Sequence, residues 1–197
     1  SDTCMKREML TEIAATLAFA AIQNNDKVGL LFFSDRIEKF IPPQKGRRHI
    51  LYLIRELLDF QPESNATDIS KPLVFLTDAV KKRCTAFLLS DFLDSGDFSN
   101  ALTIANRKHD VVALRVYDRR MEELPDVGLM LMQDLESGQT MYVDSSSKAV
   151  RKAHDTWFRE SSERLNDILT RSRVDSVSVR TDQDYVKALM SLFAKRN

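Results

Sequence analysis

Two stretches of the sequence place polar side chains where an α/β protein would do chemistry. In "KRCTAFLLSDFLD" an apolar run stops at a serine and Asp91, and in "NATDIS" Thr67 and Asp68 come just before an expected helix. Ligands of open α/β sheets lie beyond the carboxyl ends of the strands. A hydroxyl and a carboxylate that converge there from different segments suit a hard cation such as Mg²⁺.

Each of these residues also has a plainer explanation. Asp91 after a strand, or Asp68 before a helix, could cap a helix or close a turn. A third interpretation is an enzyme, a Mg²⁺-dependent hydrolase that uses Asp91 and Asp118. No general base with a convincing neighbour supports it, and the phosphate-loop, dinucleotide-loop and hydrolase-elbow patterns are absent from the sequence. We therefore expect a protein that is not an enzyme.

Histidine and cysteine give no sign of a metal centre or a nucleophile. His49, His109 and His154 are far apart in the sequence and lack the spacing of zinc ligands. Cys84 precedes an apolar strand and is expected to be a packed thiol, and Cys4 has no histidine near it. Two cysteines without a disulfide framework indicate a reducing compartment, so we expect a cytoplasmic location.

Composition limits the classes of partner. The 197 residues are 43% hydrophobic, and 29 Lys and Arg balance 29 Asp and Glu. A chain without basic excess is not expected to bind nucleic acid generally. No apolar run approaches the ~20 residues that cross a bilayer, and we predict one domain over residues 1–197 without a membrane segment.

Apolar strands alternate with helices along the chain, which predicts an α/β domain with a mainly parallel sheet and helices around it. Buried parallel strands are expected at 28–34, 86–90 and 110–118, with a last strand at 174–180. Residues 37–41 alternate and predict a short antiparallel edge strand, ended by Pro42 and Pro43. A hairpin with Gly138 in its turn is predicted from residues 124–145. Helices are expected at 9–23, 47–60, 70–82, 98–108, 147–172 and 184–196.

Four blocks of the sequence carry a resemblance. One is Asp26 to Arg48, with "DKVGLLFFSD" and "IPPQKGRR", and the others are "ATDI", "LLSDFLD" and "HDVVALRVYDRRMEELPDVG" followed by "DLESG". These blocks are similar to those of a bacterial family of unknown function, number fifty-eight among such families, whose von Willebrand factor A-like domains are associated with MoxR-type AAA+ ATPases. The likeness runs almost from end to end.

The resemblance implies a metal-ion-dependent adhesion site in which Thr67 and Asp91 are ligands. Such a site also needs a D-x-S-x-S loop after a central first strand. Only "SDTCMKRE" precedes the first expected helix, and Asp2 and Thr3 do not fit the spacing. By the resemblance the domain is N-terminally truncated, its first strand is missing, and Mg²⁺ should be weakly bound or absent, with Thr67 and Asp91 around a water or a weak ion.

A missing central strand has consequences for packing. Leu30, Phe32 and Leu88 should line the space that it leaves, and unpaired apolar edges invite pairing with another chain, including a second copy. We expect one of three responses: the open edges pair directly, a second copy lends a strand, or residues 1–7 fill the gap.

The function expected from these observations is protein binding, with a MoxR-type ATPase as the partner that the resemblance suggests. In the implied mechanism, an acidic side chain of the partner completes the coordination of Mg²⁺ in assembly or chaperone-like work. The hydrolase, and a degenerate module that binds partners without metal, stay open as alternatives.

Overall fold

Helices and strands alternate through most of the computed structural model, which describes residues 2–94, 96–133 and 140–196. The helices are α1 (Asp2–Gln23), α2 (Arg47–Asp59), α3 (Ser70–Ala79), α4 (Ser99–Lys108), α5 (Arg119–Glu122), α6 (Lys148–Arg171) and α7 (Tyr185–Arg196). The strands are β1 (Val28–Phe33), β2 (Ile37–Gln44), β3 (Thr85–Ser90), β4 (Asp110–Tyr117), β5 (Leu129–Gln133), β6 (Thr140–Asp144) and β7 (Asp175–Arg180).

The strands form three separate sheets. β3, β4 and β7 pair in parallel with β4 in the middle, while β1–β2 and β5–β6 are antiparallel pairs. The predicted α/β class and the parallel pairing of β3 with β4 are confirmed. The prediction of a single mainly parallel sheet that includes residues 28–34 is wrong, because β1 pairs with β2 alone.

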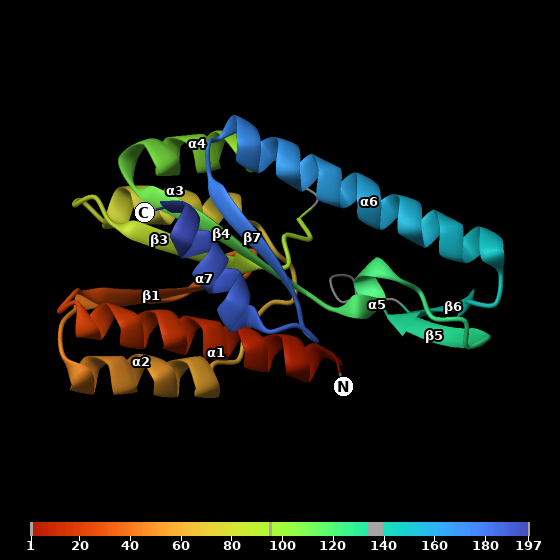
Figure 1. Ribbon diagram of the computed structural model, residues 1–197, viewed down its shortest axis with the longest axis horizontal. Coiled ribbons are helices and arrows are strands. Elements are labelled where there is room, and N and C mark those ends of the chain that lie inside the picture. Colours follow the sequence, from red (N-terminus) through yellow and green to blue (C-terminus); the bar gives the residue numbers. More distant parts are fainter. Residues whose placement is uncertain (1, 95, 134–139, 197) are drawn as a thin grey trace.

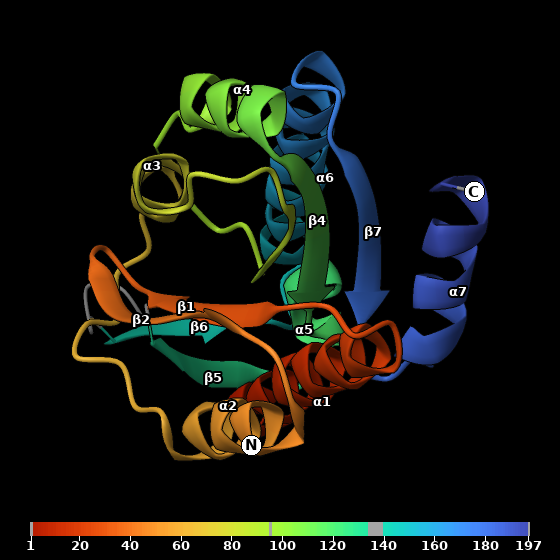
Figure 2. The same cartoon turned by 90° about the vertical axis from the view of Figure 1, so that its left-hand side faces the viewer.

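Helices cover both faces of the parallel sheet because its strands are apolar on both sides (Figures 1 and 2). On one face α3, α4 and α6 pack against Leu88, Val111 and Ala113. On the other, α1 and α7 pack against alternate residues of β4 and β7, which include Val112 and Leu114. All six residues between the ends of β4 are buried. Burial on both faces explains why these strands read as continuous apolar runs.

β1 and β3 each keep an edge without a strand partner in the described structure. The open edges have not paired directly, and the residues from Asp2 onward are helical rather than extended. Direct pairing of the two edges is therefore not seen, and residues 2–7 do not supply a strand, although Lys6 reaches Asp91 beyond β3. The side chains predicted to line that space are covered by other side chains: Phe32 stacks on Phe60 with ring centroids 4.0 Å apart, and Leu88 is 8% exposed in the α3–α4 core.

Boundaries differ from prediction where local rules compete. β2 continues through Pro42 and Pro43 to Gln44, because an edge strand can direct the missing N–H groups away from its partner. The four-residue helix α5 was not predicted, although Asp118 caps it by accepting a hydrogen bond from the Arg120 N–H at 2.8 Å. The predicted turn at Gly138 lies outside the described residues.

Among the described residues, no helix combines the length and the apolar character that a membrane crossing requires.

Candidate functional site

The loop before α3 brings the carboxyl ends of β1 and β3 together. The backbone N–H of Asp68 donates to the Ser34 carbonyl at 3.1 Å, just beyond β1. The next N–H, of Ile69, donates to the Asp94 carboxylate beyond β3 at 2.8 Å. Both strands thus run toward the same loop, and the sequence-predicted polar segments do gather at one edge.

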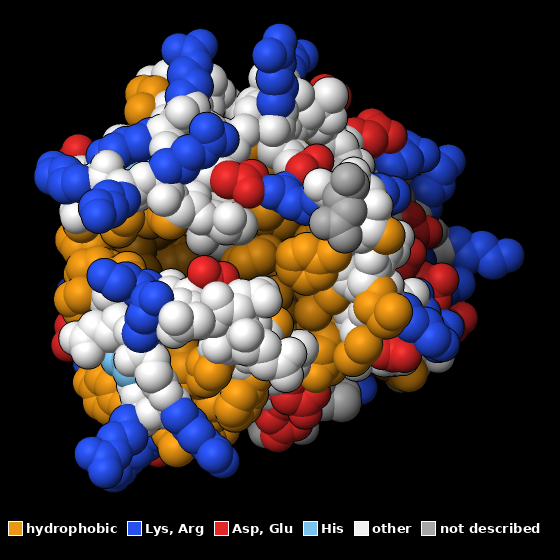
Figure 3. Space-filling model, turned by 60° about the vertical axis from the view of Figure 1, so that its left-hand side comes forward, with side chains coloured by type: hydrophobic (Ala, Val, Ile, Leu, Met, Phe, Trp, Pro, Cys, Tyr) orange, Lys and Arg blue, Asp and Glu red, His pale blue; other side chains and the backbone are white. Residues whose placement is uncertain are grey.

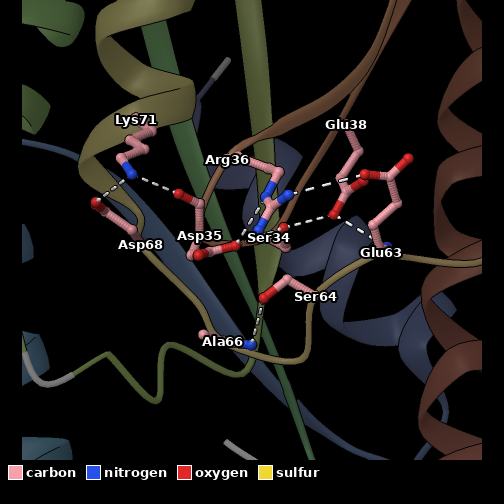
Figure 4. A network of polar contacts seen from close by, with 9 residues as sticks. All are labelled: Ser34, Asp35, Arg36, Glu38, Glu63, Ser64, Ala66, Asp68 and Lys71. Carbon is pink, nitrogen blue, oxygen red and sulfur yellow. Dashed lines mark hydrogen bonds and ion pairs between the residues drawn. The ribbon is translucent and has the colours of Figure 1, made fainter.

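A network of charged and hydroxyl groups fixes this loop to β1 and β2 (Figure 4). The buried Ser34 hydroxyl donates to Glu38 at 2.6 Å, and the Glu63 N–H donates to the same carboxylate oxygen at 3.2 Å. Arg36 reaches Asp35 at 3.3 Å, and neighbouring hydrogen-bond donors, Ser64 first, lower the pKa of Asp35. These groups satisfy one another, so the network serves to position the loop.

Asp91 lies in a tight turn at the end of β3. Its Oδ1 accepts from the Leu93 N–H at 3.2 Å, and the Ser90 hydroxyl accepts from the Phe92 N–H at 3.0 Å. Phe92 has φ 58°, a left-handed conformation that is uncommon outside glycine and costs of order 1–3 kcal/mol. The ring of Phe92 is buried in the core, and this packing holds the turn in place.

A lysine from α1 neutralises Asp91. Lys6 Nζ lies 2.5 Å from Asp91 Oδ2, and the two side chains are 21% and 19% exposed. Such a partly buried pair is costly to break on one side only, because the remaining charge loses its partner. No local pattern in the sequence connects Lys6 with Asp91, which lies 85 residues away.

Arg115 is a second basic residue at this edge that sequence reasoning missed. It is 7% exposed near the carboxyl end of β4, and its Nε donates to the Asp91 carbonyl at 3.3 Å. Its guanidinium donates to the Ser162 hydroxyl at 2.9 Å and lies over the rings of Tyr117 and Phe158, 5.1 Å from each centroid. Burial lowers its pKa from the usual value. An arginine inside the apolar run "VVALRVY" was the signal available in the sequence.

The contacts of Asp91 do not fit Mg²⁺ ligation while Lys6 is in place. Both carboxylate oxygens have protein donors, and the carboxylates of Asp68 and Asp94 accept from the Ser70 and Ile69 N–H groups. Thr67 is half-buried in the same loop, and among the hydrogen bonds of the described residues none joins it to Asp91. Within the described part of the chain, no three acidic, histidine or cysteine side chains gather as a metal site. The assignment of Thr67 and Asp91 as ligands stays a prediction.

Asp118, the second carboxylate of the hydrolase alternative, has its own partners. It caps α5 through Arg120 and accepts a hydrogen bond from the Thr181 hydroxyl at 3.0 Å. No contact joins it to Asp91 in the described structure, so the observed geometry gives no acid–base pair.

Cys84 and His109 meet at the opposite end of the sheet. The sulfur lies 3.4 Å from His109 Nδ1, and the imidazole is fully buried. Burial raises the pKa of Cys84, and burial together with Lys108 and Arg83 lowers the pKa of His109. A protonated thiol beside a neutral imidazole is a packed pair, in keeping with the predicted packing role of Cys84.

Two solved structures resemble this fold over almost its whole length. One is BatB from Bacteroides thetaiotaomicron, with a TM-score of 0.54 and 16% identity over 94% of this chain and 87% of that one. The other is an aerotolerance-related membrane protein from Bacteroides fragilis, with a TM-score of 0.54 and 12% identity over 93% and 88%. At these identities the likeness concerns the fold alone.

Uncharacterised mycobacterial proteins are similar in sequence. Rv1480 of Mycobacterium tuberculosis is 27% identical over 98% of this chain. The matched region covers 61% of the length of Rv1480. MAV169 of Mycobacterium avium is 24% identical over 79% of this chain and 93% of its own length. Residues 1–164 match the family described as "Protein of unknown function DUF58". The chain therefore belongs to the DUF58 family.

Proposed function

We propose that this chain is a protein-interaction module and that its docking surface is the β5–β6 hairpin. The observation that carries the proposal is a concentration of exposed apolar side chains on this hairpin. Leu129, Leu131 and Tyr142 are 69%, 58% and 74% exposed. Apolar side chains that gather in this way on a surface mark contact sites for other proteins.

The three side chains lie on one face of the hairpin. Leu131 is directly opposite Tyr142, and Leu129 is two residues along the same strand. An isolated two-stranded hairpin is marginally stable in water, so a covering partner would stabilise it. The hairpin and α5 lie beyond the carboxyl ends of β4 and β7, away from the β1–β2 sheet (Figure 1).

The base of the hairpin is firmly attached to α6, which favours a preformed docking surface. The buried Ser145 hydroxyl donates to the Gly128 carbonyl at 2.7 Å and accepts from the Val127 N–H at 3.1 Å. Arg151 from α6 donates to the Ser145 carbonyl at 2.5 Å and pairs with Asp126 at 3.1 Å. Because the surface is already ordered, the chain loses less conformational entropy when a partner binds.

A MoxR-type AAA+ ATPase is the partner that we propose, on the strength of the family resemblance. The module would be of the von Willebrand A type, non-enzymatic and cytoplasmic, with assembly or chaperone-like work as its role. The Lys6–Asp91 pair favours the metal-free form of this module over the form that binds through Mg²⁺.

Titration of the chain with the purified MoxR-type ATPase from the same genome tests this function. We expect saturable binding in calorimetry, and a loss of about tenfold or more for the Leu131→Ser/Tyr142→Ser variant, since apolar anchors dominate interfaces. The matched control is Val186→Ser/Met190→Ser on α7, where the replaced side chains are 44% and 68% exposed.

Two results would count against the proposal. An ATPase that does not bind the wild-type chain removes the proposed partner. Equal binding by the hairpin variant and the wild type removes the proposed surface, whatever the partner.

A further inference from the structure

We propose that Lys6 is the resident cation of Asp91 and keeps divalent metal ions away from this carboxylate. The inference goes beyond the proposed function, because it concerns the cation at the carboxyl edge and holds whether or not the hairpin binds a partner. The contacts of Asp91 disagree with the metal site that the resemblance implies.

α1 delivers the lysine ammonium from a fixed position. Arg7, the next residue, donates to the backbone carbonyls of Leu58 and Phe60 at the end of α2. Met9, one turn further, is buried against the β4–β7 face of the parallel sheet. The first turns of α1 are thus held on two sides, and the Lys6 side chain does not have to be ordered anew to reach Asp91.

Asp91 is equally fixed. Its Oδ1 accepts from the Leu93 N–H, and the Arg115 guanidinium holds its carbonyl. The ammonium lies 2.5 Å from Oδ2, and both side chains are largely shielded from solvent. A charge-assisted hydrogen bond between two positioned groups is stronger than a neutral one.

A divalent ion at Asp91 would have to displace this ammonium and then remain near it. Mg²⁺ needs near-octahedral oxygen coordination and gives up its water reluctantly. The carboxylates of Asp68 and Asp94 already accept backbone N–H groups of the α3 loop. The ion would therefore gain one carboxylate and meet the repulsion of Lys6, with Arg115 behind it.

The decisive variant is Lys6→Met, which keeps an apolar stem of similar length and removes the charge. We expect the melting temperature of the wild type to be the same in 10 mM MgCl₂ as in EDTA, to within ~1 °C. In Lys6→Met, where Asp91 no longer faces an ammonium, MgCl₂ should raise the melting temperature by a few degrees, the shift of a ligand present at about ten times its dissociation constant. The double variant Lys6→Met/Asp91→Asn should lose that response. Lys71→Met is the control, because Lys71 pairs with Asp68 at 3.7 Å on the exposed side of the same loop.

Amine labelling provides a second measurement that needs no folded variant. Lys6 of the wild type should react with an acetylating reagent about tenfold more slowly than Lys71, as followed by mass spectrometry, a ratio that corresponds to ~1.4 kcal/mol of protection. Mg²⁺ should leave this rate unchanged.

Either of two outcomes overturns the proposal. A saturable Mg²⁺ response of the wild type that speeds the labelling of Lys6 means that metal displaces the lysine. A folded Lys6→Met variant that ignores Mg²⁺ means that Lys6 is not what excludes it.

Discussion

Arg115 connects three elements through one buried side chain. It belongs to β4, donates a hydrogen bond to the Asp91 carbonyl just after β3, and reaches Ser162 and Phe158 on α6. Arginine suits this place because its planar guanidinium can donate in two directions and stack on aromatic rings at the same time.

Replacing Arg115 should cost stability. We expect Arg115→Ala to lower the free energy of unfolding by about 2–4 kcal/mol, since it leaves a cavity and a buried carbonyl without its donor. Arg115→Lys should recover part of the loss, because the charge returns without the planar fork. Urea denaturation measures both. Arg159→Ala, at an exposed position of α6, is the control and should change stability by less than ~0.5 kcal/mol.

His109 gives the fold a dependence on pH. Its pKa is lowered in the folded state, so the unfolded chain takes up a proton at higher pH than the folded chain does. Stability is therefore fully present above the ordinary histidine pKa of 6.5 and falls as the pH drops below it.

We expect the free energy of unfolding of the wild type to decrease between pH 6.5 and 5 by up to about 1.4 kcal/mol per pH unit. Denaturation curves of wild type and His109→Leu over this range measure the effect, and the variant should lack this component of the slope. Equal slopes in the two proteins would show that another group titrates.

At the scale of elements, α7 holds the amino ends of two parallel strands. Arg196 in its last turn forms ion pairs with Asp110 at the start of β4 and with Asp175 at the start of β7. These partners raise the pKa of Arg196, with Asp110 as the main cause. A basic residue in a last turn also interacts favourably with the helix dipole.

Replacing Arg196 should lower the stability of the fold only modestly. We expect Arg196→Ala to lower the free energy of unfolding by about 1 kcal/mol, because the carboxylates are partly exposed and the pairs are screened by water. Lys195→Ala, in the same turn, should be nearly neutral. The difference between the two variants should shrink in 1 M NaCl, and a difference that salt leaves unchanged would point to packing instead of charge.

The sequence predicts the positions of helices and strands better than it predicts which strands pair in a sheet. The apolar runs of β3 and β4 and the amphipathic pattern of α2 follow directly from periodicity. Whether β1 joins β3 depends on which strand lies between them, and no local pattern in "VGLLFF" decides that. At the site, the sequence placed Asp91 at a strand end, but its partner Lys6 follows only from the packing of α1.

At the scale of the whole molecule, β1 and β3 each keep one edge without a strand partner among the described residues. The side chains of β1 are mostly half-buried although its sequence is as apolar as that of β4. A strand between β1 and β3 would pair both edges and cover these side chains.

We expect an added N-terminal segment of about six apolar residues, joined to α1 by a short linker, to insert there and raise the melting temperature by several degrees. The reason is that each buried apolar side chain contributes roughly 1.5–3 kcal/mol. Thermal melts and size-exclusion chromatography would compare it with a Gly/Ser extension of equal length. If the two extended chains melt at the same temperature and are equally monomeric, the gap does not accept a strand.

A groove of about 380 Å³ lies between α3 and β2 and is lined by Ile37, Val74 and Phe75. It is a second sign that the β1–β2 sheet is separate from the rest of the fold. Figure 3 shows apolar side chains along a hollow that separates the upper and lower parts of this face. It marks a boundary between two bodies that side chains, and not a continuous sheet, hold together.

That boundary has a mechanical consequence. Tension applied to a continuous sheet is carried by rows of backbone hydrogen bonds, but between β1 and β3 the load would pass through helix α1 and the α3 loop. Pulled in an optical trap by handles attached in β2 and in β7, the molecule should yield first along this boundary, with β1, β2 and α2 peeling away as one piece. The β3–β4–β7 body, whose backbone ladders are unbroken, should give way afterwards and at a higher force.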